Sequence, residues 1–245
     1  MSHIHLPDGV LPSWLWGTGL ILTILIGAIL FRSLEKKEMA RRLPLLGMMA
    51  AAMVLGASVE IVPIAYHVNL TVISGILLGP SLIFLATLVV NVILALFGHG
   101  GITVLGLNTL TLSIEGVLGY CFFRFFWKVF KKLTPAVFLA TFLALAVSTM
   151  AMIGIVGLGT SHYDELIHQG EHQGIFDFKL QAEKGDLDHH EKSTGKGGVS
   201  LGRFMAIVLP LGFIGWMLEG VITTLIARYI SRLRPDLLGL EGGGS

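Results

Sequence analysis

The first nine residues, Met-Ser-His-Ile-His-Leu-Pro-Asp-Gly, form the stretch whose residue types are best suited to metal chemistry. If Met1 is removed, the chain begins at Ser2, and the free α-amine lies next to His3. An unprotonated amine, a deprotonated backbone amide and an imidazole can then enclose one cation in fused chelate rings. Such a planar nitrogen set suits Ni(II) or Cu(II), whereas imidazole ligands in general also suit zinc and iron. The alternative interpretation is a polar terminus whose histidines are incidental.

The composition indicates an integral membrane protein. Of the 245 residues, 53% are hydrophobic and only 13% are charged, and the mean hydropathy is +0.79. A soluble domain of this size carries about a quarter charged residues. The net charge of +1 and the lack of a basic tract give no indication of nucleic-acid binding. A single cysteine, Cys121, excludes an intramolecular disulfide and a cysteine-based zinc cluster.

Apolar length sets the expected membrane spans, because a helix needs roughly 20 apolar residues to cross a bilayer. Between Leu43 and Ile114 the only charged residue is Glu60, so this stretch must hold several passes, and Gly79-Pro80 divides it. We therefore expect an all-α membrane protein of about seven helices, with the short third helix packed inside the bundle. The expected helices are Pro12–Leu34, Pro44–Tyr66, Leu70–Leu78, Pro80–Phe97, Leu110–Val129, Pro135–Gly159 and Leu201–Ile230.

The distribution of Lys and Arg predicts the orientation of the bundle. Basic residues are concentrated in the hinge Arg32–Arg42, around Lys128–Lys132 and in the tail after Ile230. By the positive-inside rule these segments belong on the cytoplasmic side. They share one side only if the N-terminus is outside and the C-terminus is cytoplasmic. We expect one transmembrane metal-binding domain, residues 1–238, and a flexible tail, 239–245, whose native origin stays open.

Two further histidines lie in the stretch between the second and fifth expected spans. His67 is predicted to end the second span at the outer face, on the same side as the N-terminus. Glu60 lies seven positions earlier, so on one helix it would share the face of His67 two turns deeper. An intramembrane carboxylate is a functional hypothesis by default, although Glu60 could instead hydrogen-bond a neighbouring helix. His99 lies in the glycine-rich segment Gly98–Asn108, which suits irregular backbone packed around a site.

The segment 160–200 is the one hydrophilic insertion, and the predicted orientation places it outside. We expect a solvated external loop. The sharper alternative is a loop that concentrates divalent cations near the entrance, although its spacing matches no defined metal site. Its histidines are His162, His168, His172, His189 and His190.

Several of these motifs, taken in order, resemble a known family. They are HLPDGVLP near the start, His67 within YHVNL, then ILLGP and FGHGGITVLGLNTL. Together they are similar to the substrate-binding membrane subunit (S component, CbiM/NikM family) of energy-coupling-factor cobalt and nickel transporters. The resemblance covers about His3 to Leu238, with the external loop unmatched. It implies an S-component core preceded by an extra N-terminal helix.

The resemblance also implies a ligand set. In that family the terminal amine, the adjacent His and a His on the following helix hold the metal in a nearly square plane. Here two extra residues precede Pro7-Asp8-Gly9, so two registers are possible. His3 follows the amine of Ser2 directly, whereas His5 takes the family position relative to the turn. We prefer Ser2, His3 and His67 as ligands, with His5 as an additional or supporting one. Glu60, His99 and Asn108 are the expected surrounding residues.

The Pro-Asp version of the terminal turn resembles the nickel branch of the family, and a Met-Glu version resembles the cobalt branch. Low-spin Ni(II) also favours a planar nitrogen field. We therefore expect transported Ni(II) first and Co(II) second, with no catalytic cofactor.

The family resemblance implies partners in the cell membrane of a prokaryote. They are a transmembrane coupling subunit (T component), two cytoplasmic ABC ATPase subunits and, as an option, a small accessory membrane subunit. The chain has no GxxxxGK[ST] phosphate loop, so it is not expected to hydrolyse ATP. Ala52 and Gly56 form a small-xxx-small pair that either contacts the membrane partner or packs internally.

Two rival classes make different demands. A self-sufficient permease or channel requires polar groups staged across the bilayer, and the candidates are few. They are Glu60, Asn91, Glu115 and Glu219. An intramembrane zinc protease requires a His-Glu-x-x-His pair, which the sequence lacks. We therefore expect a transport subunit and no enzyme.

Overall fold

The computed structural model describes residues 13–34, 36–58, 60–61, 66–98, 101–159 and 201–238. An antiparallel pair of two-residue strands, β1 (Glu60–Ile61) and β2 (Tyr66–His67), connects α2 to α3. A 3-10 helix, η2 (Pro235–Leu238), follows the last long helix. The helices are α1 (Ser13–Ser33), α2 (Lys36–Ser58), α3 (Thr71–Leu78), α4 (Pro80–Leu96), α5 (Leu105–Phe130), α6 (Leu133–Gly159) and α9 (Leu201–Leu233). The sequence predicted an all-α fold, and the described part of the chain is mostly helical, with β1 and β2 as the exception.

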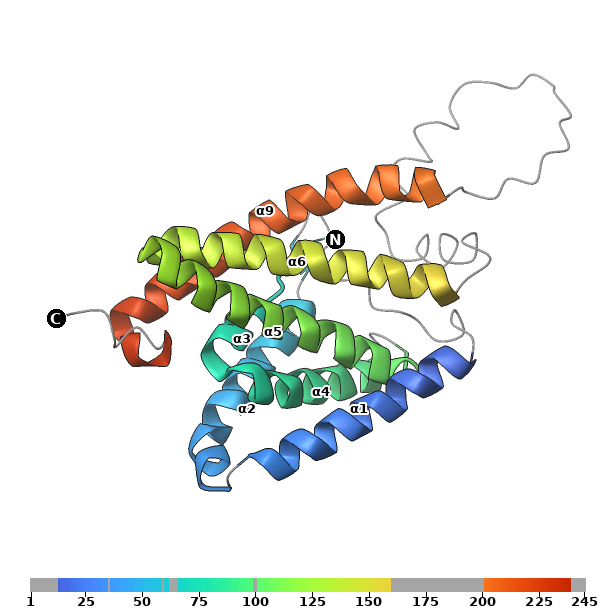
Figure 1. Cartoon of the computed structure of the whole chain (residues 1–245), viewed down its shortest axis with the longest axis horizontal. Helices are drawn as coiled ribbons and strands as arrows, with labels where there is room; N and C mark the ends of the chain where they lie inside the picture. The colour runs from blue at the N-terminus through green and yellow to red at the C-terminus, as the bar shows by residue number, and fades with distance from the viewer. Residues whose placement is uncertain are drawn as a thin grey trace, which may run out of the picture.

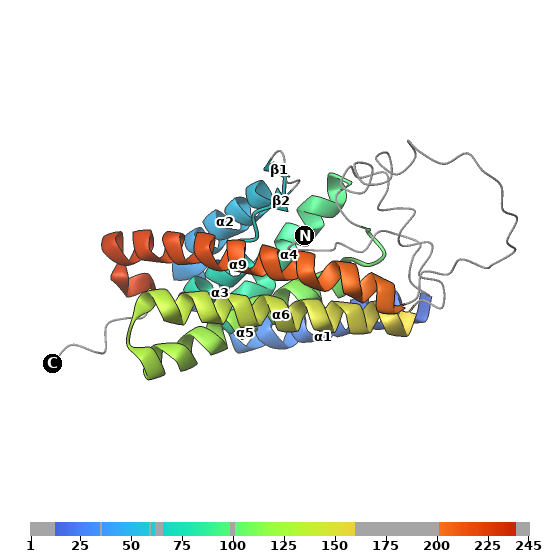
Figure 2. The same cartoon turned by 90° about the horizontal axis from the view of Figure 1, so that it is seen from above.

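Helix α5 lies at the centre of the bundle. It contacts α1, α3, α4 and α6, and α6 in turn contacts α9. Figures 1 and 2 show α6 lying between α5 and α9 along most of their length. Any polar side chain on the inner faces of α5 and α9 is consequently enclosed by protein.

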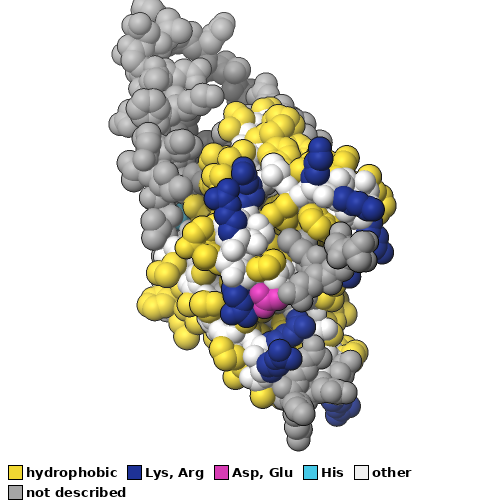
Figure 3. Space-filling model, turned by 90° about the vertical axis from the view of Figure 1, so that its left-hand side faces the viewer, with side chains coloured by type: hydrophobic (Ala, Val, Ile, Leu, Met, Phe, Trp, Pro, Cys, Tyr) yellow, Lys and Arg dark blue, Asp and Glu magenta, His cyan; other side chains and the backbone are white. Residues whose placement is uncertain are grey.

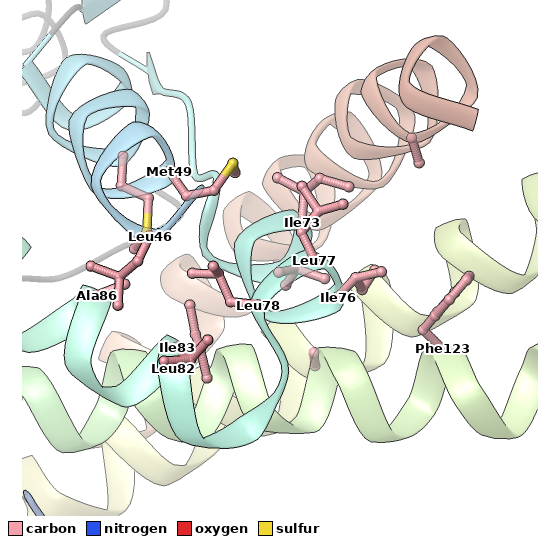
Figure 4. Close-up of a cluster of buried hydrophobic side chains, with 14 of the residues drawn as sticks. Leu46, Met49, Ile73, Ile76, Leu77, Leu78, Leu82, Ile83, Ala86 and Phe123 are labelled. Atoms are coloured by element: carbon pink, nitrogen blue, oxygen red, sulfur yellow. The ribbon is translucent and has the colours of Figure 1, made fainter. Parts of the chain in front are cut away.

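The largest apolar core is built where α2, α3, α4 and α5 meet. Figure 4 shows side chains of α2, α3 and α4 gathered together, with Phe123 of α5 farther along the same cluster. The labelled members are Leu46, Met49, Ile73, Ile76, Leu77, Leu78, Leu82, Ile83, Ala86 and Phe123. Because all eight residues of α3 are buried, the short helix is held on every side by longer ones. This confirms that the third helix is packed inside the bundle.

Several helices are long and apolar enough to cross a bilayer. Among the described residues these are Ser13–Arg32, Met39–Ser58, Leu133–Gly154 and Gly212–Leu233, and Pro80–Leu96 is a shorter apolar helix. Many large apolar side chains on α1 and α9 are exposed. A soluble protein would not leave so much apolar surface in water, but lipid tails can cover it.

The turn between α3 and α4 agrees with the predicted break. Gly79 has φ +79°, a left-handed conformation that glycine adopts without steric cost. Pro80 then opens α4 at a position where its missing N–H is not needed. The amide of Gly79 still donates to the carbonyl of Gly75 at 2.9 Å, which closes the last turn of α3.

The prediction for α2 was wrong at both ends. The helix begins at Lys36 rather than at Pro44, and it ends at Ser58 rather than near Tyr66. Pro44 lies inside the helix and has no N–H to donate to the carbonyl of Ala40. Ala40 is exposed, so the proline is tolerated there. Much of the predicted polar hinge is thus the first part of α2. The sequence did hold an indication that α2 ends before Tyr66, because Pro63 disfavours a helical conformation in the residue before it.

The expected placement of Glu60 and His67 on one helix was therefore also wrong. Both residues lie in strands, and Glu60 pairs with His67 across the antiparallel ladder. His67 follows a chain reversal instead of ending a helix. The relation of the two residues is a cross-strand pair, not a spacing of two helical turns.

Helix α5 begins earlier than predicted. It starts at Leu105, whereas the sequence suggested about Leu110. Asn108 consequently lies inside the helix and is buried, rather than in the glycine-rich segment. The helical start is favoured because the amide of Asn108 donates to the carbonyl of Val104 at 2.9 Å.

The three basic segments gather at one end of the molecule. They are the α1–α2 junction, the α5–α6 junction and the end of α9, all at the left of Figure 1. Figure 3 looks onto this end and shows Lys and Arg side chains spread across it. Arg234 and Asp236 form a two-bond ion pair there, with N–O distances of 3.0 and 2.9 Å. The hydrogen bonds from Arg234 lower the pKa of the Asp236 carboxyl.

We predict that the contact between α3 and α5 cannot accept a side chain at Gly75. A Cβ atom at Gly75 would lie 2.1 Å from the carbonyl oxygen of Gly116, and backbone cannot move aside as a flexible side chain can. Gly75→Ala should lower the free energy of unfolding by about 1–3 kcal/mol or more. Thermal unfolding in detergent measures this. The matched control is Gly47→Ala in α2, where a Cβ meets nothing within 4 Å. Equal midpoints for the two variants would contradict the predicted packing.

Candidate metal-binding site

His67 is the only histidine within the described residues, and its position defines the candidate site. It is half-buried and ends β2, and the segment Val68–Leu70 then leads into α3. Since α2 starts at the basic end and β2 follows its other end, His67 lies on the far side of α2 from the basic α1–α2 junction. An imidazole in this position can offer one nitrogen to a cation approaching from that side.

The other predicted ligands lie outside the described residues. These are Ser2, His3 and His5, together with His99 and the histidines of the segment 160–200. Among the described residues, no group of three or more His, Cys, Asp or Glu could hold a metal ion. These ligand assignments stay predictions.

We call His67–Leu70 the ligand segment. Asn69, two residues after His67, connects this segment to three helices. Its side-chain Nδ2 donates to Glu115 Oε1 of α5 at 2.5 Å. Its backbone N–H donates to Glu219 Oε2 of α9 at 3.2 Å. Its Oδ1 accepts from the backbone N–H of Thr71 at 2.8 Å, which satisfies an amide at the start of α3. One residue thus fixes the path of the chain between β2 and α3.

The two carboxylates that accept from Asn69 are deeply enclosed. Glu115 is 1% exposed, Glu219 is 0% exposed and Asn69 is 2% exposed. Ser148 of α6 contributes a further hydrogen bond to Glu115. Burying a polar group without a partner costs several kcal/mol, so such a cluster persists only when its members are hydrogen-bonded to one another. The cluster therefore joins α5, α6 and α9 to the segment that carries His67.

The remaining residues singled out from the sequence take different positions. Asn108 is buried on α5 seven residues before Glu115, which places both on the same face of that helix. Glu60 pairs with His67 through the backbone ladder. Ala52 is half-buried on α2. A Cβ atom on Gly56 would lie 2.6 Å from the carbonyl oxygen of Val68, so Gly56 lets α2 approach the ligand segment. Contact of Ala52 and Gly56 with a partner subunit stays a prediction.

Sequence reasoning missed Asn69 and did not connect Glu115 and Glu219 with His67. Both glutamates stood out as rare charged residues within apolar segments, which is a functional signal in membrane proteins. Asn69 carried a weaker signal, since Asn just before an apolar helical segment is a typical helix-start residue. The sequence could not show that Asn69 contacts Glu115 and Glu219, because these residues are 46 and 150 positions away from it in the chain.

A second packing feature places the N-terminal helix on the core. Gly106 of α5 lies against the backbone of Leu20, where an added Cβ would meet the Leu20 nitrogen at 2.6 Å. The Thr23 hydroxyl of α1 donates to the carbonyl of Gly106 at 2.9 Å. Helix α1 is therefore docked directly on α5, the helix that carries Glu115. This contact fixes the helix that follows the predicted N-terminal ligands.

Comparison with known proteins agrees with this arrangement. A model of the family CbiM, described as the cobalt uptake substrate-specific transmembrane region, matches residues 5–237. The cobalt transport protein CbiM of Sorangium cellulosum is 29% identical over 245 aligned residues, which cover 96% of this chain and 94% of that protein. A CbiM of Geobacter sulfurreducens is 31% identical over 98% of this chain and 62% of its own length.

A fused cobalt transport protein, CbiMQ, of Methanocorpusculum labreanum is 26% identical over 96% of this chain. The chain spans only 36% of the length of that fused protein. Among solved structures, the crystal structure of a truncated transition metal transporter superposes with a TM-score of 0.68 at 18% identity. The superposition covers 94% of this chain and 99% of that one, so the two share a fold.

These observations define the class of protein as a multi-pass membrane protein for metal transport, and they exclude an enzyme. The chain belongs to the CbiM family of cobalt uptake substrate-specific transmembrane proteins. The resemblance seen in the motifs of the sequence is thereby confirmed.

We predict that His67→Ala abolishes tight metal binding while the helical fold is kept. His67 lies in a two-residue strand outside the main core cluster, so losing its ring removes a donor without opening a core cavity. His162→Ala and His189→Ala, in the predicted external loop, serve as controls and should leave the affinity nearly unchanged. Isothermal titration with Ni(II), together with circular dichroism, measures both effects. Equal losses from the bundle and loop variants would place the site elsewhere.

Proposed function

We propose that this chain captures Ni(II), or Co(II) as second choice, at the outer membrane face and delivers it inward as the substrate-binding subunit of an ATP-driven energy-coupling-factor transporter. The observation that carries the proposal is the position of His67, half-buried and tied through Asn69 to the buried carboxylates of α5 and α9. Membership of a cobalt uptake family supports the class of cargo.

The proposed ligands are nitrogen atoms of the chain itself. They are the Ser2 amine, the His3 amide and imidazole, and the imidazole of His67, with His5 as an additional or supporting ligand. Two five- or six-membered chelate rings at the terminus place three nitrogens in one plane, and His67 closes the fourth side. A rigid planar field of four nitrogens favours low-spin Ni(II), and affinities in general rise from Co(II) to Ni(II) along the first-row series.

The proposed orientation follows from the charge distribution. The basic segments share one end of the molecule, and that end is assigned to the cytoplasm by the positive-inside rule. His67 follows the end of α2 that is opposite the basic α1–α2 junction. We therefore assign His67 to the external side. A cargo site on this side allows capture of metal before transport.

Delivery requires an energy source that this chain does not carry. Its sequence has no GxxxxGK[ST] phosphate loop, so ATP hydrolysis is assigned to two cytoplasmic ATPase subunits acting through a transmembrane coupling subunit. A relative in which a CbiM region occurs in a fused protein named CbiMQ supports association with a further subunit. The basic cytoplasmic end and the small residues Ala52 and Gly56 are the proposed regions of contact.

We predict that nickel displaces cobalt at equilibrium. The apo chain, loaded anaerobically with equimolar Ni(II) and Co(II) and then desalted, should retain mainly nickel, because the planar nitrogen set stabilises its low-spin form more strongly. Metal analysis by mass spectrometry gives the ratio. A bound fraction that is mainly cobalt would reject nickel as the preferred cargo while leaving the transporter class intact.

We also predict that a free amine at Ser2 is required. Placing Gly-Ser before Ser2 moves the amine out of its chelate ring without changing any side chain. Binding should fall about as far as in His3→Ala, whereas His5→Ala should do less harm. Affinity should also rise steeply with pH, because the metal must displace a proton from an amine with a pKa near 7.7–8.0 and from the backbone amide.

The control for the extension is the same chain after proteolytic removal of the added residues, which should regain full binding. Unimpaired nickel binding by the extended chain would reject the amine chelate, even though family membership would stand.

A further inference from the structure

We propose that Asn69 is the positioning residue of the metal site, which holds the His67 imidazole in the plane of the nitrogen ligands by bridging Glu115 and Glu219. The inference rests on the proposed function of His67 as a ligand. It assigns a role to the buried polar cluster that precedes α3.

The backbone is held on both sides of His67. Before it, the β1–β2 ladder pairs His67 with Glu60. After it, Gly56 of α2 approaches the Val68 carbonyl so closely that an added Cβ would lie 2.6 Å from the oxygen. The next residue, Asn69, is tied in three directions by its hydrogen bonds to α5, α9 and the start of α3. His67 therefore sits on a short segment with almost no freedom to rotate as a whole.

The chemistry of the cluster explains why residue 69 is an asparagine. Its side chain must donate to the Glu115 carboxylate and accept from the Thr71 amide at the same time. A planar amide offers a donor and an acceptor on opposite sides, whereas Asp can only accept when ionised. Serine could still accept from the Thr71 amide, but it is too short to reach Glu115. Asn69→Ser should therefore remove the hydrogen bond to Glu115 of α5 and keep the one to the Thr71 amide at the start of α3.

The low exposure of all three members makes the link stiff. In a water-excluded environment hydrogen bonds are electrostatically stronger, and leaving a partner unpaired is costly. The acceptors also come from α5 and α9, two long helices joined through α6. The ligand segment is thus anchored to the most extensive helix contacts of the bundle, not to a loop.

Rigid placement matters because a planar site has a narrow tolerance. A ligand must be held within about 0.5 Å and 10–20° of the productive geometry. An imidazole that tilts out of the plane weakens the ligand field that keeps Ni(II) low-spin and planar. Loss of the Asn69 bridge is therefore expected to change the geometry of bound nickel as well as its affinity. A purely structural role for Asn69 would alter stability but not the spectrum of the bound metal.

The experiment compares Asn69→Ala, Asn69→Ser and Glu115→Gln with the wild-type full chain in detergent, using Ni(II) as the probe. Affinity is measured by titration, and geometry by the visible absorption and magnetism of the nickel-loaded protein. Both Asn69→Ala and Asn69→Ser lose the side-chain bond to Glu115 and keep the backbone bond to Glu219. Losing the Glu115 bond should weaken binding on the order of 10–100-fold, the range found for residues that orient metal ligands. It should also convert a planar, diamagnetic signature into a paramagnetic one. Glu115→Gln keeps an oxygen acceptor for Asn69 and should retain the planar signature.

The matched control is Thr87→Ala. Thr87 on α4 shares a buried hydrogen bond of 2.6 Å with Ser113 on α5, in the same bundle but without a bond to the ligand segment. This variant should lose stability and keep the wild-type nickel affinity and spectrum. If Asn69→Ala does not fold, Asn69→Ser decides the question, because it retains a cap for α3.

His67→Ala, measured in parallel, distinguishes a failure of the proposed function from a failure of the positioning role of Asn69. Wild-type nickel binding by His67→Ala would overturn the proposed function and the positioning role together. Lost binding in His67→Ala, with wild-type affinity and planar nickel in both Asn69 variants, would overturn the positioning role alone. The same changes in Thr87→Ala as in Asn69→Ala would also overturn it, since any buried polar deletion would then have that effect.

Discussion

The hydrogen bonds that Asn69 makes to Glu115 and Glu219 are the interaction on which the rest of the site depends. They bring a polar segment into the interior of a bundle whose outer surface is apolar, and they do so with partners that are 1% and 0% exposed. Neither carboxylate could be buried there at low cost without a donor, and the turn before α3 could not be fixed there without acceptors. Helix α5, which supplies Glu115, is also the helix that contacts α1, α3, α4 and α6.

The same constraint accounts for the architecture around the site. Helix α3 is too short to span a bilayer, so its polar ends must be satisfied inside protein, and the longer helices around it supply both the apolar walls and the hydrogen-bond partners. Glycines at the closest contacts let backbones approach where a side chain would not fit, as at Gly75 against Gly116 and at Gly56 against Val68. The N-terminal helix α1 is docked on α5 in the same manner, through Gly106 and the Thr23 hydroxyl. The proposed N-terminal chelate precedes α1 in the chain, so it would be supported by α5, the same helix that anchors the segment of His67.

Much of this could be predicted from the sequence, and the failures have physical reasons. The membrane class, the buried α3 and the break at Gly79-Pro80 were predicted because apolar length and Gly-Pro pairs act locally. The ends of α2 were not, since apolar length alone does not distinguish a continuous helix from a helix followed by the short β1–β2 pair. Two-residue strands show no periodicity, so the Glu60–His67 pairing left no pattern in the sequence. The Asn69 cluster joins residues far apart in the chain, and only the packed fold brings them together.

In the proposed site, His67 completes a planar set of four nitrogen ligands supplied by this chain. X-ray absorption at the nickel edge of the loaded, full-length protein tests this ligand set, because it reports the number, type and geometry of donors around the metal. We expect a single shell of four nitrogen donors, imidazole scattering from two rings, and the edge feature of a square-planar centre. In His67→Ala one ring contribution should be missing. A six-coordinate shell dominated by oxygen in the wild-type protein would rule out the four-nitrogen site.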